Sequence, residues 1–232
     1  MPLAFLDLHV HTSASFDSIA SPESVIRAAA GRGLTHLAIT DHDRIDGAVA
    51  ARELGRRLAP ELTVIVGQEV KTSGGDLIGV FLDRSVTSGL PPGDAIAEIR
   101  AQGGLVGIPH PFDRFRGSLS TAEAMAAVAP LVDWIEVHNA RIMVGNGNER
   151  AAEFAAANKI CGVAVSDAHS AIEVGVAYVA LDGDPSSPAG LLAALPEAEL
   201  VSGRATFFVR LVTPIAKVVQ TIRGNGRKAS VQ

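Results

Sequence analysis

Six of the seven histidines in this 232-residue chain fall at the carboxyl end of a run with strand-like patterning, and only His36 lies near the beginning of one. The side chains at these ends are of the types that bind metal ions: His9, His11, Asp41, His42, Glu69, His110, His138, Asp167 and His169. In an extended strand, residues i and i+2 face the same side, so His9 and His11 can hold one cation together, as can Asp167 and His169. One cation accepts roughly four to six ligands, so this set indicates two or three cations that share a carboxylate or a water.

Each of these residues also has an ordinary structural interpretation when it is taken alone. A single histidine at a strand end is more often hydrogen-bonded than metal-bound, and we interpret His36 in that way. Asp41 could cap a helix that begins near Ile45, and Glu69 could be a solvated carboxylate. Ligand-type side chains at six strand ends together favour the metal interpretation.

The pattern of the chain predicts elements that would bring these ends together. Apolar, β-rich runs are expected as strands at 3–10, 34–40, 62–66, 77–82, 104–108, 134–137 and 162–165. Ala-rich stretches with helical spacing lie at 22–32, 45–58, 94–102, 121–128 and 147–158. This alternation predicts an α/β fold whose parallel strands, closed as a barrel or open, converge at one mouth. In 62–82, Ser73-Gly-Gly-Asp76 predicts a hairpin turn in place of a helix.

The composition narrows the class of protein. Hydrophobic residues make up 47% of the chain and charged residues 19%, which supports a folded core and excludes a disordered chain. The net charge of −5 disfavours binding to long nucleic acid, and the single cysteine, Cys161, excludes an internal disulfide and a thiolate metal cage. The chain shows neither a secretory type of start nor an apolar run long enough to span a membrane, so we expect a cytoplasmic location.

The pattern loosens after residue 180. We expect residues 1–205 to form the domain that carries the site, and residues 206–232 to form a C-terminal helix and a flexible basic tail. The segment 214–222 is amphipathic, with Ile215, Val218, Val219 and Ile222 on one face. We expect it to close the bottom of the barrel, and docking to a membrane surface is the alternative.

Six motifs resemble, in order, those of the PHP (polymerase and histidinol phosphatase) domain family, and the match spans about residues 3–170. Asp7-Leu-His9-Val-His11-Thr12 resembles the D-x-H-x-H-[ST] opening of these domains. The other five are Ile39-Thr-Asp41-His42-Asp43, Gly67-Gln-Glu69, Ile108-Pro-His110-Pro111, Glu136-Val-His138-Asn139 and Ser166-Asp167-Ala-His169. The resemblance implies an α/β fold, a distorted (β/α)7 TIM-like barrel with a metal site at the C-terminal ends of the strands.

The resemblance also implies a ligand set for two or three divalent ions of manganese, iron or zinc. One cation would take His9, His11, Glu69 and Asp167, a second would share Glu69 and add His110 and His138, and a third would use His42, His169 and Asp17. Several family members have histidine at the position of Asp17. A carboxylate there could weaken the third site or select a harder metal such as manganese.

The function implied by the resemblance is hydrolysis of a phosphate ester by a metal-activated hydroxide. The expected substrate is a small phosphorylated metabolite, a nucleotide or a short oligonucleotide, and the oligomeric state stays open. Arg114 and Arg141 could clamp the phosphate, or be ordinary surface arginines in salt bridges, and Asp41 and Glu69 are expected to support catalysis. One alternative is a metal-binding scaffold without turnover. The other is a metal-dependent amidohydrolase acting on C–N bonds, although Lys71 stands two residues later than its bridging lysine would.

Overall fold

The computed structural model describes residues 3–113, 117–119, 121–142, 144–204 and 212–226. In these residues one sheet has the strand order β7-β6-β5-β4-β3-β2-β1-β8-β9. The strands are β1 (Leu3–Val10), β2 (His36–Ile39), β3 (Thr63–Lys71), β4 (Asp76–Val80), β5 (Leu105–Ile108), β6 (Trp134–Asn139), β7 (Cys161–Val165), β8 (Tyr178–Asp182) and β9 (Glu199–Val201). The helices are α1 (Pro22–Gly31), α2 (Asp46–Leu58), α3 (Pro92–Arg100), α4 (Ala122–Val128), α5 (Gly147–Asn158), α6 (Pro188–Ala194) and α7 (Val212–Ile222), with short 3-10 turns at Ala129–Leu131 and Leu195–Glu197.

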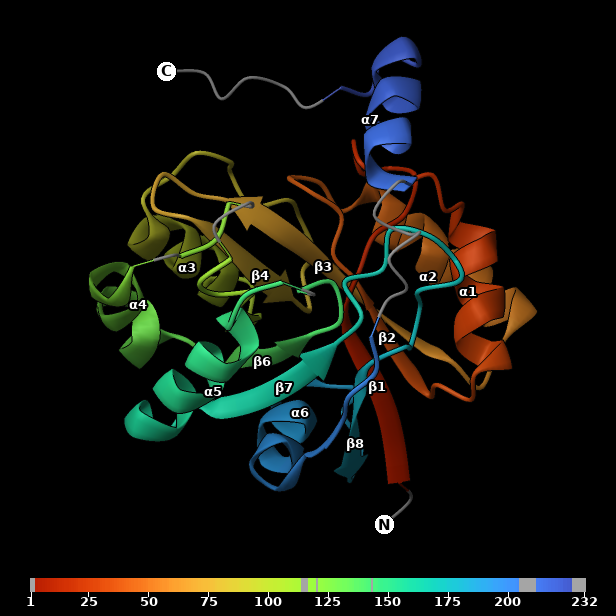
Figure 1. Cartoon of the computed structure of the whole chain (residues 1–232). Helices are drawn as coiled ribbons and strands as arrows, with labels where there is room; N and C mark the ends of the chain where they lie inside the picture. The colour runs from red at the N-terminus through yellow and green to blue at the C-terminus, as the bar shows by residue number, and fades with distance from the viewer. Residues whose placement is uncertain (1–2, 114–116, 120, 143, 205–211, 227–232) are drawn as a thin grey trace.

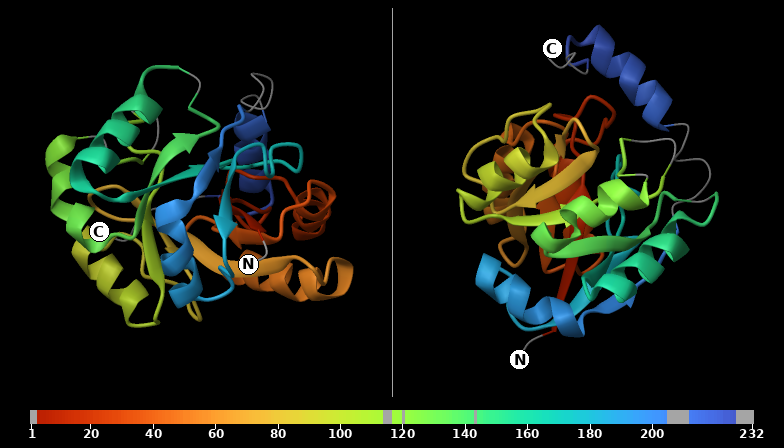
Figure 2. Two further views of the ribbon diagram at one scale, coloured as in Figure 1. Left: turned by 90° about the horizontal axis from the view of Figure 1, so that it is seen from below. Right: turned by 90° about the vertical axis from the view of Figure 1, so that its left-hand side faces the viewer.

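The sheet curves into a nearly closed barrel with helices outside it (Figures 1 and 2). One cluster of buried apolar side chains contains Leu6 of β1, Ile65 of β3, Ile78 of β4 and Val163 of β7, so strands far apart in the sheet order share one core. A second cluster packs the helices on the outer faces of the strands, as Ile26 of α1 does. Both clusters are mainly aliphatic, because only 4% of the chain is aromatic; Trp134 belongs to the first cluster and Phe112 to the second.

The strand directions place the candidate ligands at one rim. The pairs β1–β2, β2–β3, β5–β6 and β6–β7 are parallel, so their carboxyl ends lie together, whereas β4 runs antiparallel to β3 and β5. The predicted hairpin between β3 and β4 is therefore confirmed, and it pairs Asp76 at the start of β4 with Lys71 at the end of β3. The TIM-like α/β barrel is confirmed as well. The described residues do not form seven regular βα units, because β3 and β4 form a hairpin and β8 and β9 pair antiparallel.

The position predicted for the C-terminal helix is wrong. The bottom of the barrel is closed by α6, whose Leu191 belongs to the inner core cluster, and α7 lies at the opposite end above the rim (Figures 1 and 2). The reason is that α7 docks through its polar face, where the buried Gln220 donates hydrogen bonds to backbone carbonyls of the β1–α1 loop. Among the described residues no helix is long and apolar enough to cross a membrane.

Candidate metal centre

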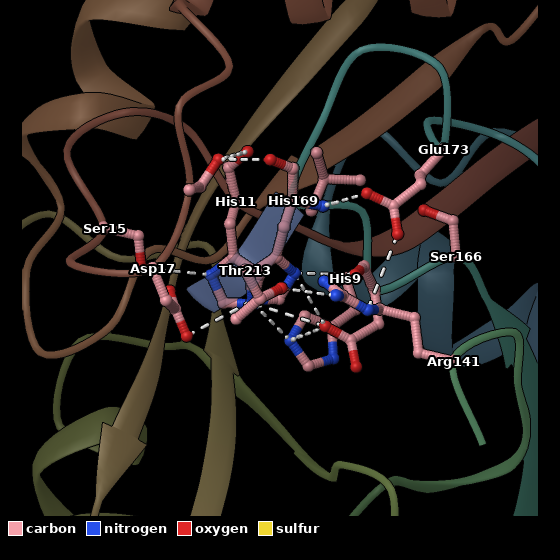
Figure 3. Close-up of polar contacts among 12 residues, drawn as sticks. His9, His11, Ser15, Asp17, Arg141, Ser166, His169, Glu173 and Thr213 are labelled. Atoms are coloured by element: carbon pink, nitrogen blue, oxygen red, sulfur yellow. Dashed lines mark hydrogen bonds and ion pairs between the residues drawn. The ribbon is translucent and has the colours of Figure 1, made fainter. Parts of the chain in front are cut away.

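The carboxyl ends of the strands bring most of the predicted ligands within reach of one another. The ligand atoms form three groups, each with all atoms within 4.8 Å: His11, Asp17, His42 and His169; His9, His110 and Asp167; and His9, His11 and Glu69. Part of this arrangement is visible in Figure 3, where His9, His11, Asp17 and His169 point toward one another. Eight of the nine predicted ligands are thus brought together.

Glu69 connects the groups. Its Oε2 lies 3.3 Å from His9 Nε2, from His11 Nε2 and from His42 Nδ1, and its Oε1 lies 3.0 Å from His110 Nε2. The side chain is almost fully buried. A carboxylate in contact with four imidazoles is suited to bridge two cations, as the sequence predicts.

Asp17 lies between two histidines. Its Oδ2 is 3.3 Å from both His42 Nε2 and His169 Nε2, and Ser15 Oγ donates a 3.1 Å hydrogen bond to its Oδ1. Glu69 is near the other ring nitrogen of His42. His42 therefore stands between two carboxylates, which links the Asp17 group to the Glu69 group.

The donor set fits divalent metal ions. Imidazole nitrogens and carboxylate oxygens face the same small volume, and His9 Nε2 lies only 2.9 Å from His11 Nε2. Asp167 Oδ1 is 3.7 Å from the first of these nitrogens and 3.6 Å from the second. Mixed nitrogen and oxygen donors of this kind suit manganese, iron and zinc. Burying such a concentration of ionisable groups without a cation would cost several kcal/mol per charge that is left unpaired.

The electrostatics of the metal-free cluster reflect this crowding. Burial by itself lowers the pKa of His9, but Glu136 and Glu69 outweigh burial and raise it to about 10. Burial also lowers the pKa of His42, and the facing Glu69 and Asp17 raise it to about 9. For Glu69, burial raises the pKa, and the histidines around it hold the pKa well below its usual value. The cluster is therefore a set of mutually stabilised opposite charges, and metal ions must displace protons from it to bind.

Glu136, which the sequence reasoning did not select, supports the ligands from behind. Its Oε1 lies 2.7 Å from His9 Nδ1, and its Oε2 accepts a 2.7 Å hydrogen bond from the backbone N–H of His110. Asn139 Nδ2 donates to both Glu136 Oε2 (2.9 Å) and Asp167 Oδ2 (3.0 Å). These contacts fix the rings and the carboxylate that face the centre, as outer partners of metal-bound histidines usually do. The signal was present in the sequence as a carboxylate inside a buried strand.

His138 is the one predicted ligand that does not join the groups. Its half-buried ring turns away, and Nε2 lies 2.7 Å from the carbonyl oxygen of Gly203. The cause is an irregularity in the β6–β7 pairing between Glu136 and His138, which breaks the alternation of side-chain directions. Glu136 and Asn139 consequently face the centre in its place.

The four other residues discussed in the sequence analysis have different surroundings. Asp41 accepts hydrogen bonds from Thr12 N (2.6 Å) and Thr12 Oγ1 (2.7 Å), so it fixes the loop after β1 and is absent from the three groups of ligand atoms. Arg141 is buried beside the centre, where Nη2 donates a 2.5 Å hydrogen bond to Thr213 Oγ1 and Nε lies 3.5 Å from Glu173 Oε1 (Figure 3). Arg114 lies outside the described residues. His36 pairs with Ser186 Oγ at 3.0 Å on the far side of the barrel, as its structural interpretation requires.

The backbone is strained at two of the ligands. His110 and Asp167 have φ angles of 29° and 53°, in the left-handed region that residues with a side chain rarely occupy. Such conformations cost on the order of 1–3 kcal/mol and are found where the surroundings hold them for a functional reason. Both lie two residues beyond the end of a strand, where the turn redirects each side chain toward the centre.

The groups open into a pocket of about 410 Å³. Its wall includes predicted ligands and Arg141, together with four residues that the sequence reasoning did not assign to the site: Phe16, Asp76, Asp113 and Lys217. The sequence could have indicated Asp76, since a hairpin after β3 returns the chain to the same rim. It could not have indicated Lys217, because the position of α7 depends on contacts between residues far apart in the chain.

Comparison with known proteins agrees with this geometry. The PHP domain model matches residues 7–139, and a model described as PHP-associated matches residues 145–200. The chain is 31% identical over 177 residues to an uncharacterised protein of Methanocaldococcus jannaschii, which covers 75% of this chain and 69% of that protein. Over 64 residues it is 48% identical to the phosphoribosyl 1,2-cyclic phosphate 1,2-diphosphodiesterase of Eggerthella lenta, covering 28% of this chain and 23% of that enzyme.

A similar solved structure is a two-domain protein from Bacteroides vulgatus that contains a predicted PHP-like metal-dependent phosphoesterase. The TM-score is 0.72 at 18% identity, and the match covers 87% of this chain and 65% of that one. At this identity the likeness concerns the fold. The family model covers more than half of the chain and contains the segments that supply His9, Glu69 and His110 to the cluster. With its histidines and carboxylates gathered at the rim of a TIM-like barrel, this chain belongs to the PHP domain family.

Proposed function

We propose that the protein is a metal-dependent phosphoesterase that hydrolyses a phosphate ester of a small metabolite, a nucleotide or a short oligonucleotide. The observation that carries the proposal is the convergence of five histidines and three carboxylates, of which three histidines and all three carboxylates line a pocket of about 410 Å³. Pockets for small ligands usually measure about 300–1,000 Å³, so a mononucleotide or a smaller phosphate ester is of suitable size.

The bound ions would supply the activation of water and the neutralisation of charge on the phosphoryl oxygens. The side chains of the protein would hold the ions and orient the substrate. Glu69 sets the spacing between the ligand groups, and Glu136 fixes the ring of His9 through its Nδ1. Arg141 lines the same pocket, and we assign it to the phosphate group of the substrate because a guanidinium matches phosphate oxygens in a fork geometry. We retain Arg114 as a second candidate for this role on the basis of the sequence alone.

Three observations support phosphate chemistry over the alternatives. The amidohydrolase alternative needs a bridging lysine, yet Lys71 is not among the described residues that line the pocket, and its backbone N–H bonds to Asp43. A scaffold without turnover would be expected to have lost ligands, whereas eight of the predicted ligands come together. The named relative from Eggerthella lenta is itself a phosphodiesterase.

The test combines metal loading with a panel of phosphate esters. The purified protein is stripped with a chelator, reloaded with manganese, iron or zinc, and assayed for release of phosphate from monoesters and of the alcohol from diesters. We expect release that depends on metal and is abolished by chelator. Full metal loading without cleavage of any ester would contradict the proposal and favour the scaffold. The variant His9→Ala should lose metal and rate together, with the exposed Arg27→Ala on α1 as the control.

A further inference from the structure

Helix α7 lies outside both segments that match the family models. A surface helix usually turns its apolar face toward the core, whereas α7 turns its polar face toward the protein. Three of its large apolar residues, Ile215, Val218 and Ile222, are 58%, 60% and 81% exposed, whereas the small Ala216 is buried. Its polar residues Thr213, Lys217 and Gln220 follow the spacing i, i+4, i+7, which places them on one face. Thr213 and Lys217 line the pocket above the ligand groups, so this polar face is turned toward the site.

The contacts of the polar face fix the helix in place. Gln220 is 2% exposed, and its Nε2 donates to the carbonyl oxygens of Ser13 (2.8 Å), Ser18 (2.6 Å) and Ser15 (3.3 Å). Just beyond the helix, Asn225 Oδ1 accepts a 2.8 Å hydrogen bond from Arg44 Nη1. These contacts hold α7 against the loop that carries Asp17, and the helix stands over the rim of the barrel in Figure 1.

Lys217 brings a positive charge to a pocket wall that is mainly acidic. The carboxylates on this wall are Asp17, Glu69, Asp76, Asp113 and Asp167. Apart from histidines, the basic residues described on the wall are Arg141 and Lys217. The ammonium of Lys217 lies 5.5 Å from the centre of the Phe16 ring, a cation–π contact that keeps it at the mouth. Arg141 is tied to the same helix through Thr213 Oγ1.

We propose that α7 forms a wall of the substrate pocket and that Lys217 binds an oxygen of the substrate phosphate, which selects small phosphate monoesters over diesters. This inference rests on the proposed phosphoesterase function. A monoester phosphate, whose second pKa is about 6, carries a second negative charge near neutral pH, whereas a diester carries one. An added cation therefore favours the monoester. Thr213 and Pro214 in the first turn of α7 also line the pocket, so the positive end of the helix dipole adds to this attraction.

The experiment uses the full chain loaded with manganese and the substitution Lys217→Gln. We measure kcat and KM for p-nitrophenyl phosphate and for bis(p-nitrophenyl) phosphate, together with metal content. Loss of the charged contact should raise KM for the monoester about tenfold and leave kcat and metal content unchanged, because the contact forms equally in ground and transition states. The diester should change less, and Lys217→Arg should restore the monoester KM. The matched control is Arg223→Gln, which removes one charge from the exposed residue directly after the same helix.

A second readout does not require turnover. We measure binding of inorganic phosphate to the manganese-loaded protein by calorimetry, and we expect it to weaken about tenfold in Lys217→Gln and to stay unchanged in Arg223→Gln. If the wild type cleaves neither ester, the phosphoesterase proposal fails, and phosphate binding still decides the role of Lys217. The inference would be overturned if the wild type and Lys217→Gln bound phosphate with equal affinity. It would also be overturned if Arg223→Gln weakened phosphate binding as much as Lys217→Gln does.

Discussion

The substitution Glu69→Gln tests the candidate metal centre most directly. It keeps the shape of the side chain and removes the charge that lies 3.0 Å from His110 Nε2 and 3.3 Å from His42 Nδ1. In the metal-free protein, burial lowers the pKa of His42 while Glu69 and then Asp17 raise it to about 9. An opposite charge at this range is worth about 1–3 pKa units, so we expect the pKa of His42 in the variant to fall by that amount.

The same substitution removes a donor shared by the ligand groups. Loss of an outer partner of a metal ligand costs about 10–100-fold in metal affinity, so loss of the shared carboxylate should cost at least about 100-fold. Metal content after dialysis and calorimetric titration with manganese measure the affinity. Nuclear magnetic resonance titration of the chelator-treated protein measures the histidine pKa values.

The control for this experiment is Glu53→Gln, since Glu53 is an exposed carboxylate on α2 that pairs with Arg56. We expect the control to match the wild type in metal content and in every histidine titration. If Glu69→Gln also retains wild-type metal content and an unchanged His42 titration, Glu69 does not connect the ligand groups and the reasoning fails.

The other predictions concern the partners of the ligands and the metal-free state. Glu136→Gln should weaken metal binding about 10–100-fold by freeing the ring of His9, and an unchanged affinity in a metal titration would contradict this. His138→Ala should keep the metal content and lower the free energy of unfolding by about 1 kcal/mol in a denaturant titration, because its ring bonds to a backbone carbonyl; loss of metal would show that it is a ligand. Metal at about 100 times its Kd should add about 2.7 kcal/mol of stability per site, seen as a higher Tm than in chelator. In the metal-free protein, the raised pKa values of His9 (about 10) and His42 (about 9) give stability that is complete below the ordinary value of 6.5 and is lost as the pH rises through 9 to 10. The lowered pKa of Glu69 gives stability that is lost as the pH falls below its ordinary value of 4.5. The chelated protein should therefore unfold most easily at both extremes of pH. A free energy of unfolding that stays constant from pH 7 to 10 would contradict the histidine assignment.

The barrel could be predicted from the sequence because its elements have local signals. Ser21 caps α1 through a 3.1 Å hydrogen bond from the N–H of Ser24, with Pro22 following in the first turn, and the strands are short apolar runs. The Gly-containing turn at 73–76 marked the hairpin between β3 and β4. The pairing of β8 with β1 had no such signal, because antiparallel contacts between strands about 170 residues apart depend on how the sheet closes.

The prediction of the site succeeded where side-chain direction follows from regular geometry. His9 and His11 are two residues apart at the end of a strand, and both face the centre, as strand alternation requires. The same rule applied to β6 would put Glu136 and His138 on one side. The irregular pairing of β6 with β7 turns His138 toward Gly203 and brings Asn139 inward.

Irregular strand pairing of this kind depends on packing between distant parts of the molecule, so the local sequence does not predict it. The same holds for α7, whose apolar stripe is typical of a helix that packs on a core. Gln220 instead donates hydrogen bonds to three backbone carbonyls in the loop after β1. These hydrogen bonds turn the polar face of the helix inward and leave Ile215 exposed. Buried carbonyl groups need partners, and a single side-chain amide that satisfies several of them can outweigh the burial of an apolar stripe. Lys217, which is far from the motifs in the sequence, thereby lies at the mouth of the pocket with its positive charge.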